Sequence, residues 1–188
     1  ERDLTIARGI QQGLLPRESP AVPGFDIAGW NRPADETGGD FFDFLPLPDG
    51  RLAVAIADAT GHGIGPALVM AEARALFRAL IGGPDGVDRA VAGMHRLLSL
   101  DLPENRFVTA FCGVLAPADA TLEFVSAGQG PIFLFEAAGR SFRELPAQGL
   151  PLAFFPDAVY EGTTRVGFAP GDMLVLLTDG FYEWARED

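Results

Sequence analysis

Apolar residues recur along this chain with two different periods, which separate the expected helices from the expected strands. Near the start, steps of three and four residues are typical of one face of a helix, and they predict a helix over residues 2–15. The apolar positions of this face are Leu4, Ala7, Ile10 and Leu14. Pro16 then ends the helix, because proline has no amide N–H to continue the hydrogen-bond ladder. We expect the apolar face to pack on this domain or on a partner helix.

Two further helices are expected in the middle of the chain, over residues 66–81 and 87–100. Pro66 suits a first helical position, and glycines at 82 and 83 end the first of the two helices. The positions expected to face the core are Leu68, Ala71, Ala75, Leu76 and Ala79 in the first, and Val87, Val91, Met94, Leu97 and Leu98 in the second. We interpret His95, which lies among polar and apolar neighbours, as a surface residue.

The other apolar segments are short and are separated by turn-forming residues, as expected for antiparallel strands. The segments read as strands are 25–33, 40–47, 51–58, 107–115, 122–127, 132–135, 142–145, 160–168 and 173–178. The last two are expected to form a hairpin that turns at Pro170-Gly171. Helices in the first half with antiparallel strands around them predict an α+β fold, with two sheets packed face to face and helices outside.

The expected hairpin around Pro48-Asp49-Gly50 places two acidic residues at the same end of a sheet. In an antiparallel pair, the start of one strand lies opposite the end of the next. Asp40 starts the first strand and Asp58 ends the second, so we expect these two side chains to meet. Asp43 is an odd number of steps from Asp40 and is expected to face the other side of the strand.

Three aspartates share a strand-end setting beside glycine: Asp40, Asp58 and Asp179. A charged carboxylate at the end of an apolar strand is costly unless it is paired or binds a cation. Oxygen ligands from separate strands favour Mg²⁺ or Mn²⁺, because zinc prefers cysteine and histidine. The alternative is that each aspartate caps a turn, as aspartate readily does. Taken together, the three sites favour a shared metal pocket.

Composition and charge limit the remaining functions. The chain has 188 residues, 48% of them hydrophobic, which is enough for one globular domain with a sizeable core. Its formal net charge of −12 disfavours nonspecific binding to nucleic acid or anionic membranes. The single cysteine, Cys112, excludes an internal disulfide, and we expect a buried, inert thiol. With no membrane span or signal peptide in the pattern, we expect a cytoplasmic protein.

Six motifs in this order resemble the SpoIIE/RsbU branch of the PPM metal-dependent Ser/Thr protein phosphatases. They are Ala7-x-x-Ile10-Gln11-x-x-Leu14-Leu15-Pro16, Gly38-Gly39-Asp40-Phe41-Phe42-Asp43, Ile56-Ala57-Asp58-x-x-Gly61-His62-Gly63, Arg106-Phe-Val-Thr-Ala-Phe111, Ser126-Ala-Gly128-x-Gly-Pro131 and Pro170-Gly171-Asp172-x-Leu-x-Leu-Leu-Thr-Asp179-Gly180. The resemblance extends over nearly the whole chain. It implies an α-β-β-α sandwich of two antiparallel sheets flanked by helices.

The resemblance also implies a reaction and a set of site residues. A Mn²⁺ or Mg²⁺ pair would be held by Asp40, Asp58, the backbone carbonyl of Ala59, and Asp179. Asp40 and Asp58 would act in catalysis through metal-bound water, which attacks phosphoserine or phosphothreonine directly. The expected substrate is an anti-sigma factor antagonist, and the expected input is a sensor domain upstream in the same polypeptide. Residues 1–16 would be a linker or regulatory helix, in which residues 2–15 could form a homodimer contact, and residues 17–188 would be the phosphatase domain.

The sequence departs from the family pattern in two places. The family carries a further metal aspartate in an Asp-Asp-x-[Ser/Thr] strand near its C-terminus, and we expect this strand to lie beyond Asp188. Gln129 stands where many relatives carry histidine. Two nearby roles stay open: His62 is either a general acid or a loop residue, and Arg32 is either a phosphate clamp or an exposed arginine.

Two other functions remain as alternatives to a phosphoprotein phosphatase. The first is a catalytically inactive phosphatase fold that only binds its partner or dimerises through residues 2–15. The second is an enzyme that hydrolyses a small phosphate ester. Manganese binding and aryl-phosphate turnover distinguish a phosphatase from the binding module.

Overall fold

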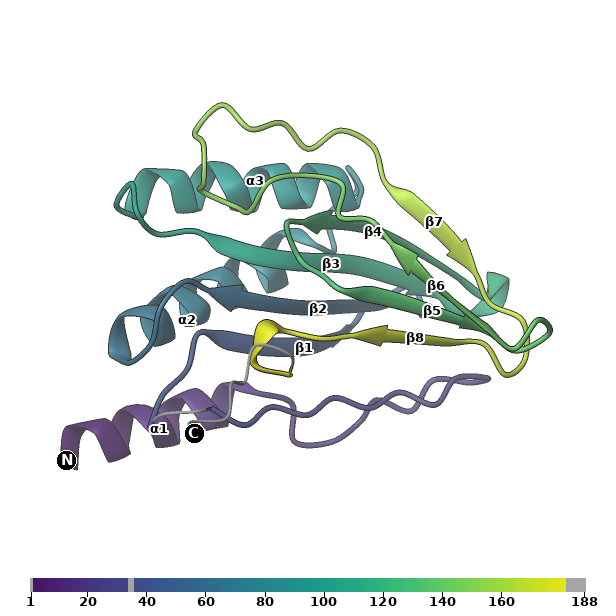
Figure 1. The fold of residues 1–188 in the computed structure, drawn as a ribbon, viewed down its shortest axis with the longest axis horizontal. Helices are drawn as coiled ribbons and strands as arrows, with labels where there is room; N and C mark the ends of the chain where they lie inside the picture. The colour runs from purple at the N-terminus through teal and green to yellow at the C-terminus, as the bar shows by residue number, and fades with distance from the viewer. Residues whose placement is uncertain (1, 34–35, 182–188) are drawn as a thin grey trace, which may run out of the picture.

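Two antiparallel sheets and three helices make up the described part of the chain (Figure 1), which in this computed structural model comprises residues 2–33 and 36–181. The helices are α1 (Arg2–Leu14), α2 (Ile64–Leu80) and α3 (Val87–Asp101). The strands are β1 (Asp40–Pro46), β2 (Leu52–Ala59), β3 (Val108–Ala116), β4 (Thr121–Ala127), β5 (Ile132–Glu136), β6 (Ser141–Leu145), β7 (Thr164–Gly167) and β8 (Met173–Leu176). Short 3₁₀ turns follow at η1 (Pro117–Asp119) and η2 (Asp179–Phe181). The predicted α+β architecture is confirmed.

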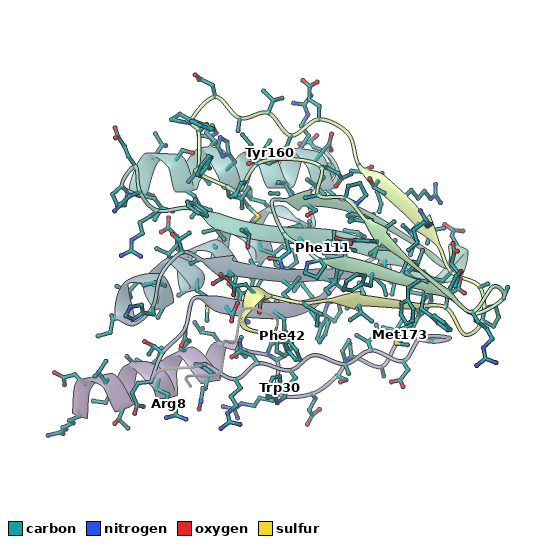
Figure 2. The ribbon with its side chains drawn as sticks, in the orientation of Figure 1. Arg8, Trp30, Phe42, Phe111, Tyr160 and Met173 are labelled. Carbon is teal, nitrogen blue, oxygen red and sulfur yellow. The ribbon has the colours of Figure 1, made fainter. Side chains whose placement is uncertain are left out.

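The larger sheet has the strand order β1-β2-β3-β4-β7, and the smaller has the order β6-β5-β8. Side chains alternate between the two faces of each strand, so β2 serves two cores at once. Its alanines at 53, 55 and 57 are buried against α2 and α3, where small side chains let the helices approach closely. On the opposite face, Leu52 packs with residues of the smaller sheet. Phe111, labelled in Figure 2, belongs to this second core between the sheets.

Two strand predictions are wrong. Residues 25–33 form no strand; Val22 and Phe25 share one isolated bridge, and Phe25 and Ile27 contribute side chains to the core between the sheets. The expected hairpin of residues 160–168 and 173–178 is also absent. Instead β7 pairs with β4 and β8 pairs with β5, so the turn at residues 170–171 carries the chain from one sheet to the other. Apolar alternation marks a strand but does not identify the strand beside it.

The predicted buried face of α2 is wrong as well. The helix begins at Ile64 and buries Pro66, Ala67, Met70, Ala73 and Phe77. Leu68, which was expected inside, is 67% exposed. The helix is rich in alanine, so several of its faces have similar apolar character. The large side chains of Met70 and Phe77 determine which face packs against the core.

In the other helices, single polar residues depart from the prediction. The α3 positions Val87, Val91, Met94 and Leu98 are buried as expected, but His95 is also buried, at 4% exposure. Its Nδ1 accepts a hydrogen bond from the Ala153 amide, and its Nε2 lies 3.1 Å from the Pro156 carbonyl.

The buried face of α1 agrees with the expected one at Leu4, Ala7 and Leu14, which are half-buried, but not at Ile10. Ile10 is 63% exposed, and the neighbouring Gln11 is buried. No helix within residues 2–33 and 36–181 has the length and apolar character needed to cross a membrane.

Candidate metal centre

The two aspartates of the β1–β2 hairpin meet at one end of the larger sheet. Asp40, the first residue of β1, is the direct ladder partner of Asp58, the penultimate residue of β2. Phe41 and Asp43 face the helices, so by alternation Asp40 lies on the face toward the smaller sheet. The hairpin geometry expected from the sequence is therefore confirmed for this pair.

The backbone beside this pair is packed tightly around Gly39. The Ala59 amide donates a hydrogen bond to the Gly39 carbonyl over 3.2 Å. A Cβ atom at position 39 would overlap the carbonyl oxygen of Ala59 and would lie 2.8 Å from Asp58 Oδ1. Two of the expected oxygen ligands thus adjoin the same small space, which is open only because residue 39 is glycine.

The environment of Asp40 raises the pKa of its carboxyl group. Its pKa is raised to about 6, chiefly by burial; a hydrogen bond from the Thr178 hydroxyl opposes the increase, and the negative charge of Asp179 adds to it. Asp179 begins η2 directly after Thr178 and is exposed. The segment after β8 therefore lies close enough to Asp40 for both a hydrogen bond and charge repulsion.

One oxygen of Asp40 has no partner of its own. Asp40 Oδ1 is buried and accepts no hydrogen bond, a state that is costly for a carboxylate. An oxygen-coordinated divalent cation would relieve this cost, so the residues present fit such an ion. Among the residues that the structure describes, no group of three or more His, Cys, Asp or Glu side chains is arranged to hold a metal ion. The acidic residues at this end of the sheet are therefore the Asp40–Asp58 pair and, near Asp40, Asp179.

Arg106 is a residue near the site to which the sequence pattern assigned no role. Its Nη1 donates to the carbonyl of Thr60 over 2.6 Å, immediately after Ala59. The guanidinium fills the bend of the β2–α2 turn, where a Cβ at Gly61 would lie 2.6 Å from Nη1. Arg106 therefore fixes the turn that follows the Ala59 carbonyl. The signal was present in the sequence, because Arg106 opens one of the six motifs.

Gln11 of α1 is a second residue whose role the sequence did not reveal. Its buried carboxamide donates from Nε2 to the Gly38 carbonyl over 2.5 Å and accepts at Oε1 from the Gly38 amide over 3.1 Å. Both bonds act on the residue that precedes Gly39-Asp40. The first helix is therefore bonded directly to the backbone that carries the site.

Asp43 lies on the helix-facing side of β1, as expected, and is completely buried. Its carboxylate accepts hydrogen bonds of 2.5 and 2.8 Å from Arg78. Arg74 Nε lies 3.1 Å from Asp43 Oδ2, within ion-pair distance but without hydrogen-bond geometry. These contacts join the strand that starts with Asp40 to α2.

Three other expected residues have simple outcomes. Arg32 and His62 are exposed, which agrees with the plainer reading of Arg32 and leaves a general-acid role of His62 as a prediction. Cys112 is buried, and burial raises its pKa to about 12, so the thiol stays protonated and inert as expected.

Comparison with known proteins gives consistent matches. Residues 48–188 match the family model of Stage II sporulation protein E (SpoIIE). Phosphoserine phosphatase RsbU of Bacillus subtilis is 27% identical over 186 residues, which cover 99% of this chain and 55% of RsbU. The crystal structure of the RsbU and RsbW domains of Rv1364c from Mycobacterium tuberculosis matches at 28% identity with a TM-score of 0.68, covering 80% of this chain and 41% of that one.

A second solved structure supports the fold across the whole chain. The SiaA-PP2C domain of Pseudomonas aeruginosa matches with a TM-score of 0.81 at 24% identity, covering 100% of this chain and 74% of that one. The chain spans about half the length of RsbU. Since the family model covers most of the sequence and the sheets match a PP2C fold, the chain belongs to the Stage II sporulation protein E (SpoIIE) family.

Proposed function

We propose that this chain is a metal-dependent phosphatase domain that hydrolyses phosphoserine or phosphothreonine on a signalling protein. The observation that carries the proposal is the buried, unpartnered Oδ1 of Asp40, beside Asp58 at the end of the β1–β2 ladder. The similarity to RsbU, which is named a phosphoserine phosphatase, supports the same reaction.

The ligands of the proposed site come from three segments: Asp40, Asp58 with the Ala59 carbonyl, and Asp179. A Mn²⁺ or Mg²⁺ pair bound there would lower the pKa of a water molecule and orient it toward the phosphoryl group. The chain itself supplies the positions of these oxygens. Gly39, which has no Cβ, leaves room beside the Ala59 carbonyl and the Asp58 carboxylate, and Arg106 fixes the turn after Ala59. The Thr178 hydroxyl bonds to the Asp40 carboxylate, which is ionised above about pH 6.

The partner and the regulation belong to the same proposal. The substrate would be a small phosphorylated protein of the anti-sigma-antagonist class, and residues 1–16 would link the domain at 17–188 to an upstream sensor. Ile6 and Ile10 of α1 are 52% and 63% exposed and lie one helical turn apart. This outward apolar pair supports a contact of α1 with a second helix, either of another copy or of the upstream segment.

The test is Mn²⁺-dependent hydrolysis of a phosphoserine protein by the full-length protein and its variants. We expect Asp40→Asn and Asp58→Asn each to lower kcat/KM by about 100-fold or more, because each removes a charged ligand oxygen. Asp49→Asn is the control, since Asp49 lies on the exposed β1–β2 turn. Unchanged hydrolysis in the Asp40 and Asp58 variants would contradict the proposal.

The alternatives give other results in the same experiments. An inactive binding module would bind its protein partner without Mn²⁺ affinity. An esterase for small phosphates would hydrolyse an aryl phosphate but not the phosphoprotein.

A further inference from the structure

Gln129 is a buried polar residue in the loop between β4 and β5, and its side chain bridges the two sheets. It is 2% exposed. Its Oε1 accepts a hydrogen bond from the Thr109 hydroxyl over 2.9 Å, and its Nε2 donates to the Leu177 carbonyl over 2.8 Å. Thr109 belongs to β3 of the larger sheet, whereas Leu177 directly follows β8 of the smaller sheet. One carboxamide therefore connects the two layers.

The two residues that Gln129 joins both adjoin the acidic end. Thr109 is the ladder partner of Asp58. Leu177 precedes Thr178, whose hydroxyl bonds to Asp40, and Asp179, whose charge raises the Asp40 pKa. The bridge thus runs from the neighbour of one aspartate to the segment that carries another. No other side chain described above connects β3 to this segment.

The backbone of Gln129 is itself held in place. The Ser126 hydroxyl, which is fully buried, donates to the Gln129 carbonyl over 2.6 Å. The side chain is therefore anchored at its base and bonded at both ends of its carboxamide. The remaining contacts between the sheets are largely apolar, as in the packing of Phe111 and Phe124 with Ile132 and Leu134. Apolar packing is non-directional, so it sets the sheet separation less strictly than a hydrogen-bonded bridge.

We propose that Gln129 is a positioning residue that holds the Leu177–Asp179 segment against β3 and thereby sets the spacing of the acidic oxygens. This proposal rests on the proposed function only where it concerns metal affinity. The bridge requires one acceptor and one donor on the same side chain. Ionised glutamate has the same shape but cannot donate to the Leu177 carbonyl, and leucine can form neither bond. A neutral histidine has one donor and one acceptor and can restore both.

The first measurement needs neither metal nor substrate. Hydrogen–deuterium exchange of the full-length, metal-free protein reports opening of the segment at residues 173–181. We expect Gln129→Leu and Gln129→Glu to raise exchange there about tenfold, since a lost buried hydrogen bond weakens local closure by that order. Gln129→His should stay within about threefold of the wild type. Gln12→Glu, on the exposed face of α1, is the control for the added negative charge.

The second measurement is Mn²⁺ affinity by calorimetry. We expect the dissociation constant to rise about tenfold or more in Gln129→Leu and Gln129→Glu and to recover in Gln129→His, as for groups that orient metal ligands. A merely structural role of Gln129 would lower the melting temperature without this pattern of loss and rescue.

The outcomes separate this proposal from the function on which it rests. Unchanged exchange at residues 173–181 in Gln129→Leu overturns the role of Gln129, whatever the metal does. A wild-type protein without Mn²⁺ affinity overturns the proposed function, while the exchange contrast still decides whether Gln129 holds the segment. If Gln129→Leu does not fold, Thr109→Val removes one bond of the bridge, and unchanged exchange in that variant overturns the proposal.

Discussion

Asp40 and Asp58 are direct partners in the β1–β2 ladder, so two acidic side chains stand across from each other at the end of the sheet. Like charges directly opposite in a ladder destabilise it. Asp40 is also mostly withdrawn from water, and burial is the largest cause of its raised pKa. In the metal-free protein, the repulsion between the two carboxylates and the burial of Asp40 therefore lower the stability of the fold. A bound cation would make the same pair of carboxylates stabilising.

The first prediction is a pH dependence of stability without metal. The pKa of Asp40 rises from its ordinary value of 3.8 to about 6 on folding, so the folded protein binds this proton more tightly. The free energy of unfolding should therefore fall as pH rises from about 4 to 6 and then level off, by roughly 3 kcal/mol in total. Urea unfolding in the presence of a metal chelator at several pH values measures this change in the free energy of unfolding.

Asp40→Asn removes the titrating group and should remove this part of the slope, which leaves the variant more stable than the wild type at pH 7. Asp49→Asn serves as the control, because hydrogen bonds from Arg51 lower the pKa of Asp49, and any effect falls below pH 4. Equal slopes between pH 4 and 6 in the wild type and Asp40→Asn would contradict the assignment.

Gly39 gives the second prediction. Because a Cβ there would overlap the Ala59 carbonyl oxygen, Gly39→Ala must push β1 and β2 apart beside both aspartates. We expect a loss of about 1–3 kcal/mol in the free energy of unfolding, as for overpacked sites, and a Mn²⁺ dissociation constant at least about tenfold higher. Gly167→Ala is the matched control on β7, since a Cβ there meets nothing within 4 Å. Wild-type metal affinity in Gly39→Ala would rule out the Ala59 and Asp58 oxygens as ligands.

The sequence predicted the acidic pair because its geometry depends on local information. A tight turn at residues 48–50 fixes the register of the hairpin, and that register decides that Asp40 meets Asp58. The pairing of β7 and β8 with different sheets depends on contacts far along the chain, which alternation cannot report.

Buried polar residues were missed for a related reason. Gln11 and His95 look like surface residues in a helical pattern, but backbone groups distant in sequence satisfy both: Gly38 for Gln11, and Ala153 with Pro156 for His95. Polarity predicts exposure only when no such partner exists in the fold.

The third prediction concerns the bonds from α1 to the site. Gln11→Ala leaves the part-buried amide and carbonyl of Gly38 without these partners, which should cost about 1–3 kcal/mol of unfolding free energy. Amide exchange at residues 38–40 should rise at the same time. Gln12→Ala, next in sequence but exposed, should change the stability by no more than about 0.5 kcal/mol. Equal stability of the two variants would show that α1 is not coupled to Gly38 in solution.

The last prediction concerns the ion pairs behind the site. Asp43 is completely buried, and Arg74 is only 13% exposed, whereas Arg78 is 40% exposed and can reach water. Burial lowers the pKa of Arg74, and the charge of Asp43 opposes this effect, so the arginine depends on its partner. Asp43→Asn leaves a largely buried cation without its counter-charge and should cost about 3–5 kcal/mol in urea unfolding.

The double variant Asp43→Leu/Arg74→Met removes both charges and should lose much less stability, because an apolar pair of similar size needs no desolvation of ions. Asp49→Asn breaks the exposed ion pair with Arg51 and should change the stability little, because water screens this pair. If Asp43→Asn is no more harmful than Asp49→Asn, the buried ion pairs are not what joins β1 to α2. If it is as harmful as expected but Mn²⁺ affinity is unchanged, α2 stabilises the sheet without positioning Asp40.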